Sequence, residues 1–542
     1  MGSYDGAEVC ELVGLFMLNN LCDKYGKDNV GLYRDDGLAI FKNTTASQAE
    51  RIKKDITKHF KKHGNCIKMA ARLFNVSRLN LLKKFSKSNE KQLNDFYTYS
   101  SEPFHPLPNK VPTWRTAEEA TAVIKSYDRV WVHGSSMTPT PLINAMAEHG
   151  RNSGLKKVEV MHILTEGPME ITKPEFEGIF RVNALFLDKN TRGVVNEGRA
   201  DYVPIFLSEI PLLFERGIVN IDVALIQVSP PDEHGFCTLG SAVECTRAAI
   251  INAKYIIGLV NSKVPRTFGH SGIHMSHIDV MVAEEMDLPS NKLKEFSDIE
   301  KMIAMHIAGN LVADGATLQM GIGTIPQAVC EQLRHHRDLG IHTEMFGDKV
   351  VDLMELGCIT NARKSFAQGK SVVSFVVGSR RVYDFLDNNL FVLMYDVRTC
   401  NNIRIICQNT KMTAINSAIE IDLTGQVVAD SIGTEMYSGV GGQIDFIRGA
   451  ALALDALGKP IIAMPSRTKD ASPKIVPQIK LGAGVVTTRA HVHYIVTEYG
   501  IAQLFGKNLR QRAYELINIA HPDDREMLEH AAFKRLKCMP SP

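Results

Sequence analysis

Glu344 is the side chain of this sequence best placed for covalent chemistry. It stands in the segment LGIHTEMFGD, directly after an apolar run, between Thr343 and Met345. Residues at the carboxyl ends of parallel strands line the ligand crevice of an α/β sheet. A carboxylate at such a place is a candidate nucleophile or general base. Its position alone fits better a solvated glutamate at the end of a strand or next to a helix N-cap.

Two glycine-rich segments could approach a ligand closely. LQMGIGTIPQAV places Gly321 and Gly323 at the end of an expected strand, with Pro326 placed to start a helix. YSGVGGQIDFIRGA places Gly441 and Gly442 before a second expected helix. Successive backbone N–H groups at such turns form anion cradles or oxyanion holes. Plain tight turns explain both segments as well, and the first lacks the third glycine of a dinucleotide-binding fingerprint.

A loop of mixed basic residues follows in MPSRTKDASPK, with Arg467, Lys469 and Lys474. These side chains could meet phosphates or the pantetheine arm of a cofactor. A solvated run of charges is the alternative interpretation.

Composition narrows the class of protein. The 542 residues are 44% hydrophobic with a formal net charge of +2, which gives no reason to expect nucleic acid or an anionic membrane as a partner. No apolar run reaches the roughly 20 residues that a membrane-spanning helix needs. The ten cysteines form no CxxC pair and no zinc-ligand spacing. Free thiols in a reducing compartment and no metal site are therefore expected.

Alternating elements must position these segments. Short apolar runs at 129–134, 157–164, 223–229, 255–260 and 277–283 predict buried strands, and residues 116–127 and 139–150 predict helices between them. A second alternating set begins with a helix at 298–315 and continues with strands at 371–378, 412–421, 460–465 and 493–500. This alternation predicts a parallel α/β fold with two domains that meet near residue 300.

Residues 1–68 differ from this body. They are lysine-rich and contain GLYRDDGLAIF, in which the Tyr-x-Asp-Asp stretch predicts a tight hairpin. Two adjacent carboxylates could hold Mg²⁺, and the stretch resembles the Tyr-x-Asp-Asp motif of reverse transcriptases. Only about thirty residues precede Tyr33, too few for the rest of a polymerase. A non-functional remnant or a fused gene segment is the interpretation, against a residual binding role.

Residues 69–110 form a third segment. MAARLFNVSRLNLLKKFSKS from Met69 carries basic residues among apolar ones and no acid, which is typical of a mitochondrial transit peptide. We therefore expect Met69 to be the natural start and the protein to be mitochondrial if Met69 is exposed, otherwise cytoplasmic. A basic surface helix is the alternative. Residues 91–110 are polar and predict a linker.

Together, five motifs carry a family resemblance over residues 110–538. GIGTIPQAV, LGIHTEM, INSAIEIDLTGQV, SGVGGQIDFIRGA and VTEYGIAQLFGKNLRQRAYELINIAHPDDRE occur in this order, with a further match at VNSKVPRTFG. They resemble the acetyl-CoA hydrolase/transferase family, especially acetate and 4-hydroxybutyrate CoA-transferases.

The resemblance implies roles for particular residues. Glu344 is expected to form a glutamyl-CoA thioester, with Gly441 and Gly442 as backbone donors near the thioester oxygen. A second group is expected to contact CoA: Gly321, Ile322, Gly323, Thr324, Ile325, Ser438 and Lys469. Ser438 stands where some members have Asn, and the loop around Lys469 differs in length. Glu498 and Arg266 are expected as further polar residues of the active site.

The implied fold is two related open α/β domains of the CoA-transferase type, residues 111–297 and 298–542, with the active site at their interface. The implied reaction moves CoA from acetyl-CoA, or another short acyl-CoA, to a small carboxylic acid such as succinate. Acetyl-CoA hydrolysis is the alternative. We expect no permanently bound cofactor, since CoA serves as substrate and covalent intermediate. Acyl-CoA and small carboxylic acids are the expected partners. We expect a homo-oligomer, as a dimer, and no nucleic acid or membrane as a partner.

Overall fold

The computed structural model describes residues 31–32, 39–40, 102–290, 295–321 and 323–542. The chain divides into one unit of residues 1–98 and another of residues 99–542. In the first unit, β1 (Gly31–Leu32) pairs antiparallel with β2 (Ala39–Ile40). This pairing flanks the Tyr-x-Asp-Asp stretch as the predicted hairpin requires. The stretch itself, at 33–36, and the predicted transit peptide lie outside the described residues.

The first sheet of the second unit has eight strands in the order β3-β13-β10-β8-β4-β5-β6-β7, all paired parallel. Its central strands are buried almost throughout, because helices cover both faces of a parallel sheet. The five strands predicted between residues 129 and 283 all lie in it. The bounds are β3 (Thr113–Trp114), β4 (Arg129–Val132), β5 (Val158–His162), β6 (Phe180–Ala184), β7 (Asp201–Tyr202), β8 (Ile221–Val228), β10 (Ala253–Val260) and β13 (Val280–Ala283).

Short helices connect these strands. Helix α5 is shorter than the predicted 116–127. It starts from a capping box between Thr116 and Glu119 and ends five residues later, and Tyr127 adopts a left-handed backbone with φ of 70°. The bounds are α5 (Ala117–Thr121), α6 (Thr140–Asn152), α7 (Arg192–Asn196), α8 (Ile210–Glu215) and α9 (Thr246–Asn252).

The second sheet has nine strands in the order β11-β17-β16-β15-β14-β18-β23-β25-β26. All neighbours are parallel except the terminal pair β25–β26. The bounds are β11 (Phe268–Gly269), β14 (Thr317–Met320), β15 (Gly340–Phe346), β16 (Ser371–Val376), β17 (Val392–Met394), β18 (Thr413–Ser417), β23 (Lys459–Ala463), β25 (Tyr494–Thr497) and β26 (Gly500–Gln503). The single strand predicted at 412–421 is wrong. The chain leaves the sheet after β18, and Glu420–Asp422 pairs elsewhere as β19.

Nine helices surround the second sheet in the described part of the chain. Helix α11 begins at Thr324, so the predicted Pro326 lies in its first turn. The bounds are α10 (Asp298–Asn310), α11 (Thr324–Gln332), α12 (Asp348–Glu355), α13 (Arg380–Leu386), α14 (Val397–Cys400), α15 (Ile403–Ile406), α16 (Gln443–Ala451), α17 (Leu509–Asn518) and α18 (Pro522–Leu536).

Three small sheets complete the unit. They are the pair β9 (Phe236–Thr238) and β12 (Gly272–His274), the trio β19 (Glu420–Asp422), β20 (Val427–Val428) and β24 (Ile475–Val476), and the pair β21 (Ser431–Ile432) and β22 (Glu435–Met436). No helix among the described residues is long and apolar enough to span a membrane.

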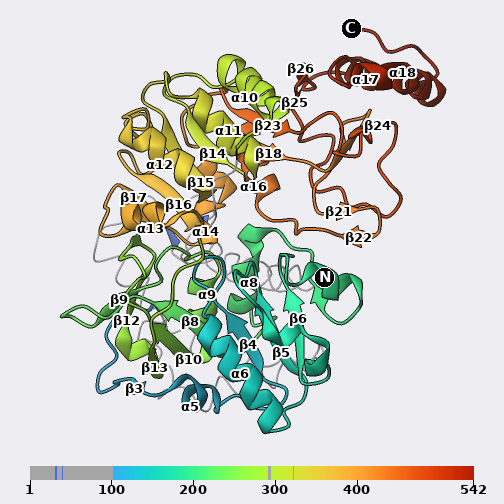
Figure 1. The fold of residues 1–542 in the computed structure, drawn as a ribbon. Helices are drawn as coiled ribbons and strands as arrows, with labels where there is room; N and C mark the ends of the chain where they lie inside the picture. Colours follow the sequence, from blue (N-terminus) through green and yellow to red (C-terminus); the bar gives the residue numbers. More distant parts are fainter. Residues whose placement is uncertain (1–30, 33–38, 41–101, 291–294, 322) are drawn as a thin grey trace. The chain divides into compact units, whose positions relative to one another are not determined.

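We call residues 102–290 the first half of this unit and residues 295–542 the second half. One buried apolar cluster contains strand residues from both sheets, such as Trp131 and Ile341. β11 belongs to the first half by sequence but pairs with β17 of the second sheet. Figure 1 shows the first sheet in blue, teal and green and most of the second in yellow and orange, with α14 on the side of the second sheet that faces the first half. The predicted class of two α/β domains is therefore confirmed.

Candidate active site

Glu344 lies within β15, near the carboxyl end of a central strand of the second sheet. The strand does not end before it, as the sequence suggested, but continues to Phe346. Beside it, the carbonyl of Ser374 on β16 accepts a hydrogen bond from the backbone N–H of Val243 at 3.0 Å. The first half therefore reaches the sheet next to the candidate nucleophile.

The Glu344 carboxylate is held by an amide. Asn401, at the end of α14, donates from Nδ2 to Oε2 of Glu344 at 3.0 Å. Burial raises the pKa of Glu344 to about 7, against which the bond from Asn401 acts. A carboxyl with this pKa is an anion for much of the time near neutral pH, yet is poorly solvated, which favours its use as a nucleophile.

Gly442 supplies the backbone that faces this carboxylate. A Cβ atom at Gly442 would lie 2.0 Å from Oε2 of Glu344 and 2.2 Å from Nδ2 of Asn401, so only glycine allows this approach. Gly442 caps the N-terminus of α16, where the first N–H groups have no partner within the helix. Gly441 has φ of +61°, a conformation that favours glycine. The structure thus brings Glu344, Gly441 and Gly442 together.

Residues of the first half contact the loop that carries these glycines, and we call these contacts the clasp. Arg192 donates from Nε to the Tyr437 carbonyl at 2.6 Å, and its guanidinium lies 3.8 Å from the centre of the Tyr437 ring. Asn196 exchanges two hydrogen bonds with the backbone of Met436, at 2.8 and 3.0 Å. Closer to the turn, the N–H of Leu207 donates to the Gly441 carbonyl at 3.0 Å. The glycine turn is therefore fixed by contacts between the halves.

The segment 321–325 follows the neighbouring strand β14. Thr343, next to Glu344, exchanges hydrogen bonds with the backbone of Met320 at 3.0 and 3.1 Å. The Gly321 N–H donates to the carbonyl of Ile415 at 2.8 Å. Gly323 has φ of +140° and precedes α11, in which Ile325 is buried. The segment thus lies beside the strand of Glu344, and Ile322 lies outside the described residues.

Thr324 bonds to an acid, Glu300, that sequence reasoning did not single out. Burial acts to raise the pKa of Glu300, but hydrogen bonds from the Thr324 hydroxyl and from Ser297, with a smaller contribution from the charge of Lys469, lower it overall. Lys469 itself is exposed. An exposed lysine is suited to an anionic group, as is the N-terminus of a helix such as α11.

Glu498 and Arg266 form polar contacts with residues other than Glu344. Glu498 is buried and accepts bonds from the N–H and the hydroxyl of Ser466, at 2.9 and 2.6 Å. Arg266 forms an ion pair with Asp232 at 2.6 Å. In the described part of the chain, neither side chain forms a hydrogen bond or ion pair with Glu344. Ser438 contributes its N–H to the carbonyl of Asp430 at 2.9 Å, which shapes the start of the glycine loop.

The thiols and the histidine near Glu344 are not poised for chemistry. Burial raises the pKa of Cys245 and Cys400 well above the usual range, so both remain protonated. Burial, with the charge of Lys364, lowers the pKa of His342 to about 3. Its ring bonds to the Cys400 carbonyl and to Asn409, so His342 is a neutral structural residue.

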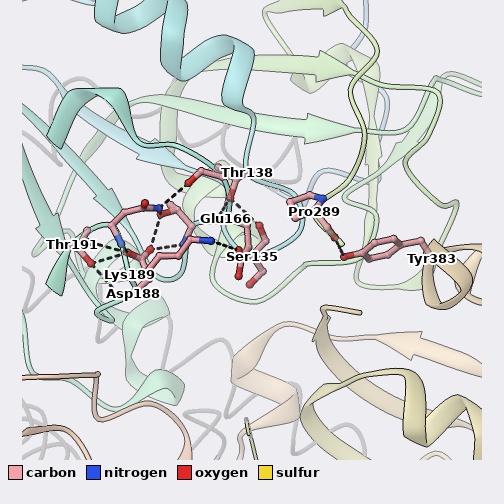
Figure 2. Close-up of polar contacts among 11 residues, drawn as sticks. Ser135, Thr138, Glu166, Asp188, Lys189, Thr191, Pro289 and Tyr383 are labelled. Atoms are coloured by element: carbon pink, nitrogen blue, oxygen red, sulfur yellow. Dashed lines mark hydrogen bonds and ion pairs between the residues drawn. The ribbon is translucent and has the colours of Figure 1, made fainter. Parts of the chain in front are cut away.

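Polar contacts also order the loops at the carboxyl edge of the first sheet (Figure 2). The Thr138 hydroxyl accepts from the N–H of Glu166 at 3.0 Å, and Lys189 donates to the Glu166 carboxylate at 3.1 Å. From the second half, the Tyr383 hydroxyl donates to the carbonyl of Pro289 at 2.6 Å. These contacts fix the loops that follow β4, β5 and β6 and link the halves again.

Sequence reasoning missed Asn401 and Asp445. Both are buried, and Nδ2 of Asn401 lies 3.3 Å from Oδ2 of Asp445. Asn401 stands in the polar stretch TCNNIR and carries no local signal. Asp445 had one, because it interrupts an apolar stretch in QIDFIRGA, and a carboxylate on the apolar face of a helix needs a partner.

Comparisons with known proteins identify the family of the chain. Residues 109–289 match the acetyl-CoA hydrolase/transferase N-terminal domain, and residues 378–532 match the C-terminal domain of the same family. A succinyl-CoA:acetate/propanoyl-CoA:succinate CoA transferase of Fasciola hepatica is 56% identical over 442 residues, 81% of this chain and 92% of that protein. A 4-hydroxybutyrate coenzyme A transferase of Clostridium kluyveri is 45% identical over 422 residues, 78% of this chain and 97% of that protein.

Solved structures give the same result. RipA from Yersinia pestis superposes with a TM-score of 0.74 at 32% identity, over 79% of this chain and 98% of RipA. A 4-hydroxybutyrate CoA-transferase from Porphyromonas gingivalis gives a TM-score of 0.67 at 34% identity, over 78% of this chain and 98% of that one.

More distant relatives include an acetyl-CoA hydrolase of Yarrowia lipolytica, 27% identical over 401 residues, 64% of this chain and 75% of that protein. The chain belongs to the acetyl-CoA hydrolase/transferase family and is an enzyme of that family, with CoA-transferases as its close homologues.

Proposed function

We propose that the protein transfers CoA between short carboxylic acids, with acetate, propanoate and succinate as substrates, and that Glu344 carries the CoA as a thioester. The observation that carries this proposal is the placement of the Glu344 carboxylate, which is held by Asn401 and faces the backbone of Gly442. The substrate class is supported by the Fasciola hepatica relative, a succinyl-CoA:acetate/propanoyl-CoA:succinate CoA transferase.

The reaction balances without an external oxidant or energy source. A carboxylate oxygen of Glu344 attacks the acyl-CoA carbonyl, the C–S bond breaks, and an acyl-glutamyl anhydride and CoA thiolate form. The thiolate attacks the glutamyl carbonyl and expels the first acid as its carboxylate. The carboxylate of the second acid then attacks the glutamyl thioester, which gives a second acyl-glutamyl anhydride and releases the CoA thiolate. The thiolate attacks the acyl carbonyl of the second acid in this anhydride, and the new acyl-CoA leaves. Glu344 is regenerated as a carboxylate, so no net proton is consumed.

Two physical effects lower the barrier. CoA bound along residues 321–325 would hold its carbonyl near Glu344, and such positioning is worth roughly 7–11 kcal/mol in well-oriented reactions. Backbone N–H groups at the start of α16 would stabilise the tetrahedral oxyanion, where loss of one donor costs about 3–4 kcal/mol in other enzymes. Lys469 and the N-terminus of α11 are suited to the phosphates of CoA.

Hydrolysis is the second candidate function, favoured by the acetyl-CoA hydrolases among the distant relatives. Water that reached the anhydride or the thioester would release acid and CoA, so exclusion of water separates the two activities. The loss of acetyl-CoA measured with and without added succinate distinguishes them. Acceleration by succinate supports transfer, whereas a rate that succinate leaves unchanged supports hydrolysis.

The covalent step has a direct test. Wild-type protein incubated with acetyl-CoA alone should gain the mass of CoA, less one water, on the peptide that contains Glu344. Glu344→Ala should lose both the adduct and the transfer activity while keeping its thermal transition. Glu355→Ala, at the exposed end of α12, is the matched control and should keep both. Near-wild-type transfer by Glu344→Ala would exclude this mechanism.

Three further properties are also proposals. A homodimer is expected. The molar mass of the purified protein, measured by light scattering, tests this. Mitochondrial import from Met69 is tested by mass spectrometry of the native N-terminus. No cofactor beyond CoA and no nucleic acid are expected as ligands. Salt-sensitive nucleic-acid binding that is lost on removal of residues 1–68 would contradict the last expectation.

A further inference from the structure

Asp445 is a buried carboxyl between the two halves. It lies in the first turn of α16 and is 2% exposed. The Ser208 hydroxyl of the first half donates to Oδ1 at 2.8 Å. Nδ2 of Asn401 in the second half lies 3.3 Å from Oδ2. Each carboxylate oxygen therefore has a partner from a different half.

The same amide nitrogen serves Glu344. Nδ2 of Asn401 carries two hydrogens, and its two acceptors are Oε2 of Glu344 at 3.0 Å and Oδ2 of Asp445 at 3.3 Å. The opposite atom, Oδ1 of Asn401, is buried without a hydrogen-bond partner. The reverse orientation would place this oxygen against two carboxyl groups, so the two acids together determine how the amide lies.

We propose that Asp445 is a positioning residue for the nucleophile: held by Ser208 across the contact between the halves, it orients the Asn401 amide, which in turn holds the Glu344 carboxylate in place for attack. This inference rests on the proposed function, because it gives Asp445 a role in the alignment of Glu344. Ser208 lies one residue after Leu207, which bonds to Gly441. The contact between the halves therefore fixes the position of the glycine turn through Leu207 and the orientation of the nucleophile through Ser208.

Charge favours a neutral Asp445 while Glu344 is ionised. Burial, with a smaller contribution from the charge of Glu344, raises the pKa of Asp445 to about 7, against the bonds from Ser208 and Asn401. Two nearby carboxyls in a low-dielectric site do not ionise together readily. A neutral amide should therefore replace Asp445 well, since its oxygen accepts from Asn401 and its nitrogen donates to the Ser208 hydroxyl.

Two substitutions of similar size separate positioning from packing. Asp445→Asn keeps both hydrogen bonds, and Asp445→Leu keeps neither. We expect Asp445→Asn to retain kcat within about fivefold. Asp445→Leu should lower kcat and the single-turnover rate of glutamyl-CoA formation by about 10–100-fold, the scale expected from misplacement of a reacting group. The KM for acetyl-CoA should stay within about twofold, because Asp445 does not face CoA in this proposal.

Asp422→Leu is a control for general destabilisation, and a severe one, because Asp422 also pairs with Arg535 at 3.3 Å. Asp422 is also fully buried and accepts a hydrogen bond from a hydroxyl, that of Thr424 at 2.6 Å. We expect this variant to lower the melting temperature and to leave kcat per folded molecule unchanged. If Asp445→Leu behaves in the same way, or if Asp445→Asn loses as much kcat as Asp445→Leu, Asp445 is not a positioning residue.

Ser208 provides a second test if Asp445→Leu does not fold. Ser208→Ala deletes one hydroxyl and should lower kcat by about 3–10-fold, the effect of one hydrogen bond. Ser208→Thr keeps the hydroxyl and should restore the rate. Unchanged kcat in Ser208→Ala would overturn the inference. Absence of the CoA adduct from the wild-type protein would instead refute the proposed function, so the two failures are distinguishable.

Discussion

The Glu344 carboxylate lies directly against the backbone of Gly442. A methyl group at residue 442 would come within 2.0 Å of Oε2, which is far inside van der Waals contact. Glu344 belongs to a strand of the second sheet and Gly442 to the loop that the first half clasps. The two residues therefore meet only because sheet and loop are both fixed, and the resulting geometry makes several predictions.

Gly442→Ala should abolish most transfer activity without unfolding the protein. The added Cβ would displace either Glu344 or the start of α16, and we expect kcat to fall at least about 100-fold. Gly309→Ala in α10 is the control, because a Cβ there meets nothing within 4 Å. The control should keep its activity and gain up to about 1 kcal/mol of stability from the better helix former. Steady-state kinetics and thermal unfolding of both variants check this, and an active Gly442→Ala would disprove the close approach.

Glu344→Gln should be more stable than the wild type at high pH. The pKa of Glu344 is raised by burial from 4.5 to about 7 in the folded protein. The folded state therefore binds more protons than the unfolded state between these values, and the free energy of unfolding falls as pH rises through this window. The loss is at most about 3 kcal/mol, and less because Glu344 keeps part of its surface in solvent. The glutamine of Glu344→Gln cannot ionise, so this variant does not lose that free energy of unfolding.

Denaturant unfolding at pH 5 and pH 8 measures this difference. The stability gap between Glu344→Gln and the wild type should widen towards pH 8. Asp445 titrates in the same range and remains in both proteins, so each curve retains a slope of its own. An identical pH dependence for the two proteins would show that the Glu344 carboxyl is not desolvated.

The fold was predictable because its strands are apolar and periodic. The runs at 129–134, 223–229 and 255–260 became β4, β8 and β10, since buried parallel strands read as continuous apolar segments. The break between β18 and β19 was not predictable, because residues 418–419 continue the apolar pattern while tertiary pairing sends Glu420 to another sheet.

The site was predictable only where a motif carried it. Glu344, Gly441 and Gly442 stand in segments with distinctive spacing. Asn401 is 57 residues from Glu344 in the sequence, and only the position of a short helix places the two side chains together. Glu498 and Arg266 were expected at the site from resemblance. Their partners Ser466 and Asp232 could not be inferred, because both contacts arise from loops that meet only in the folded chain.

Ser466→Ala should lower stability more than it lowers the rate of the chemical step. Glu498 is buried and depends on Ser466 for two hydrogen bonds, of which the substitution removes the one from the hydroxyl. Loss of a donor to a buried carboxylate costs about 1–3 kcal/mol. Ser379→Ala, which removes a hydroxyl donor to the buried Asp348, is a comparable control. A fall in kcat with unchanged stability would instead place Glu498 in the reaction.

Arg192→Ala should loosen the clasp on the glycine loop and so lower both stability and kcat. The guanidinium bonds to the Tyr437 carbonyl and lies over its ring, and together these contacts are worth about 1–3 kcal/mol. Arg380→Ala, which removes an exposed ion pair with Asp384, should cost only about 0.3–0.5 kcal/mol.

Because Arg192 lies outside the reacting groups, its effect on kcat must come from the mobility of the loop. Arg192→Lys keeps the charge but loses the planar stacking, and we expect it to recover part of the rate. Hydrogen exchange of the Gly441 and Gly442 amides should rise in Arg192→Ala and not in Arg380→Ala, and equal exchange in the two variants would show that the clasp does not hold the turn.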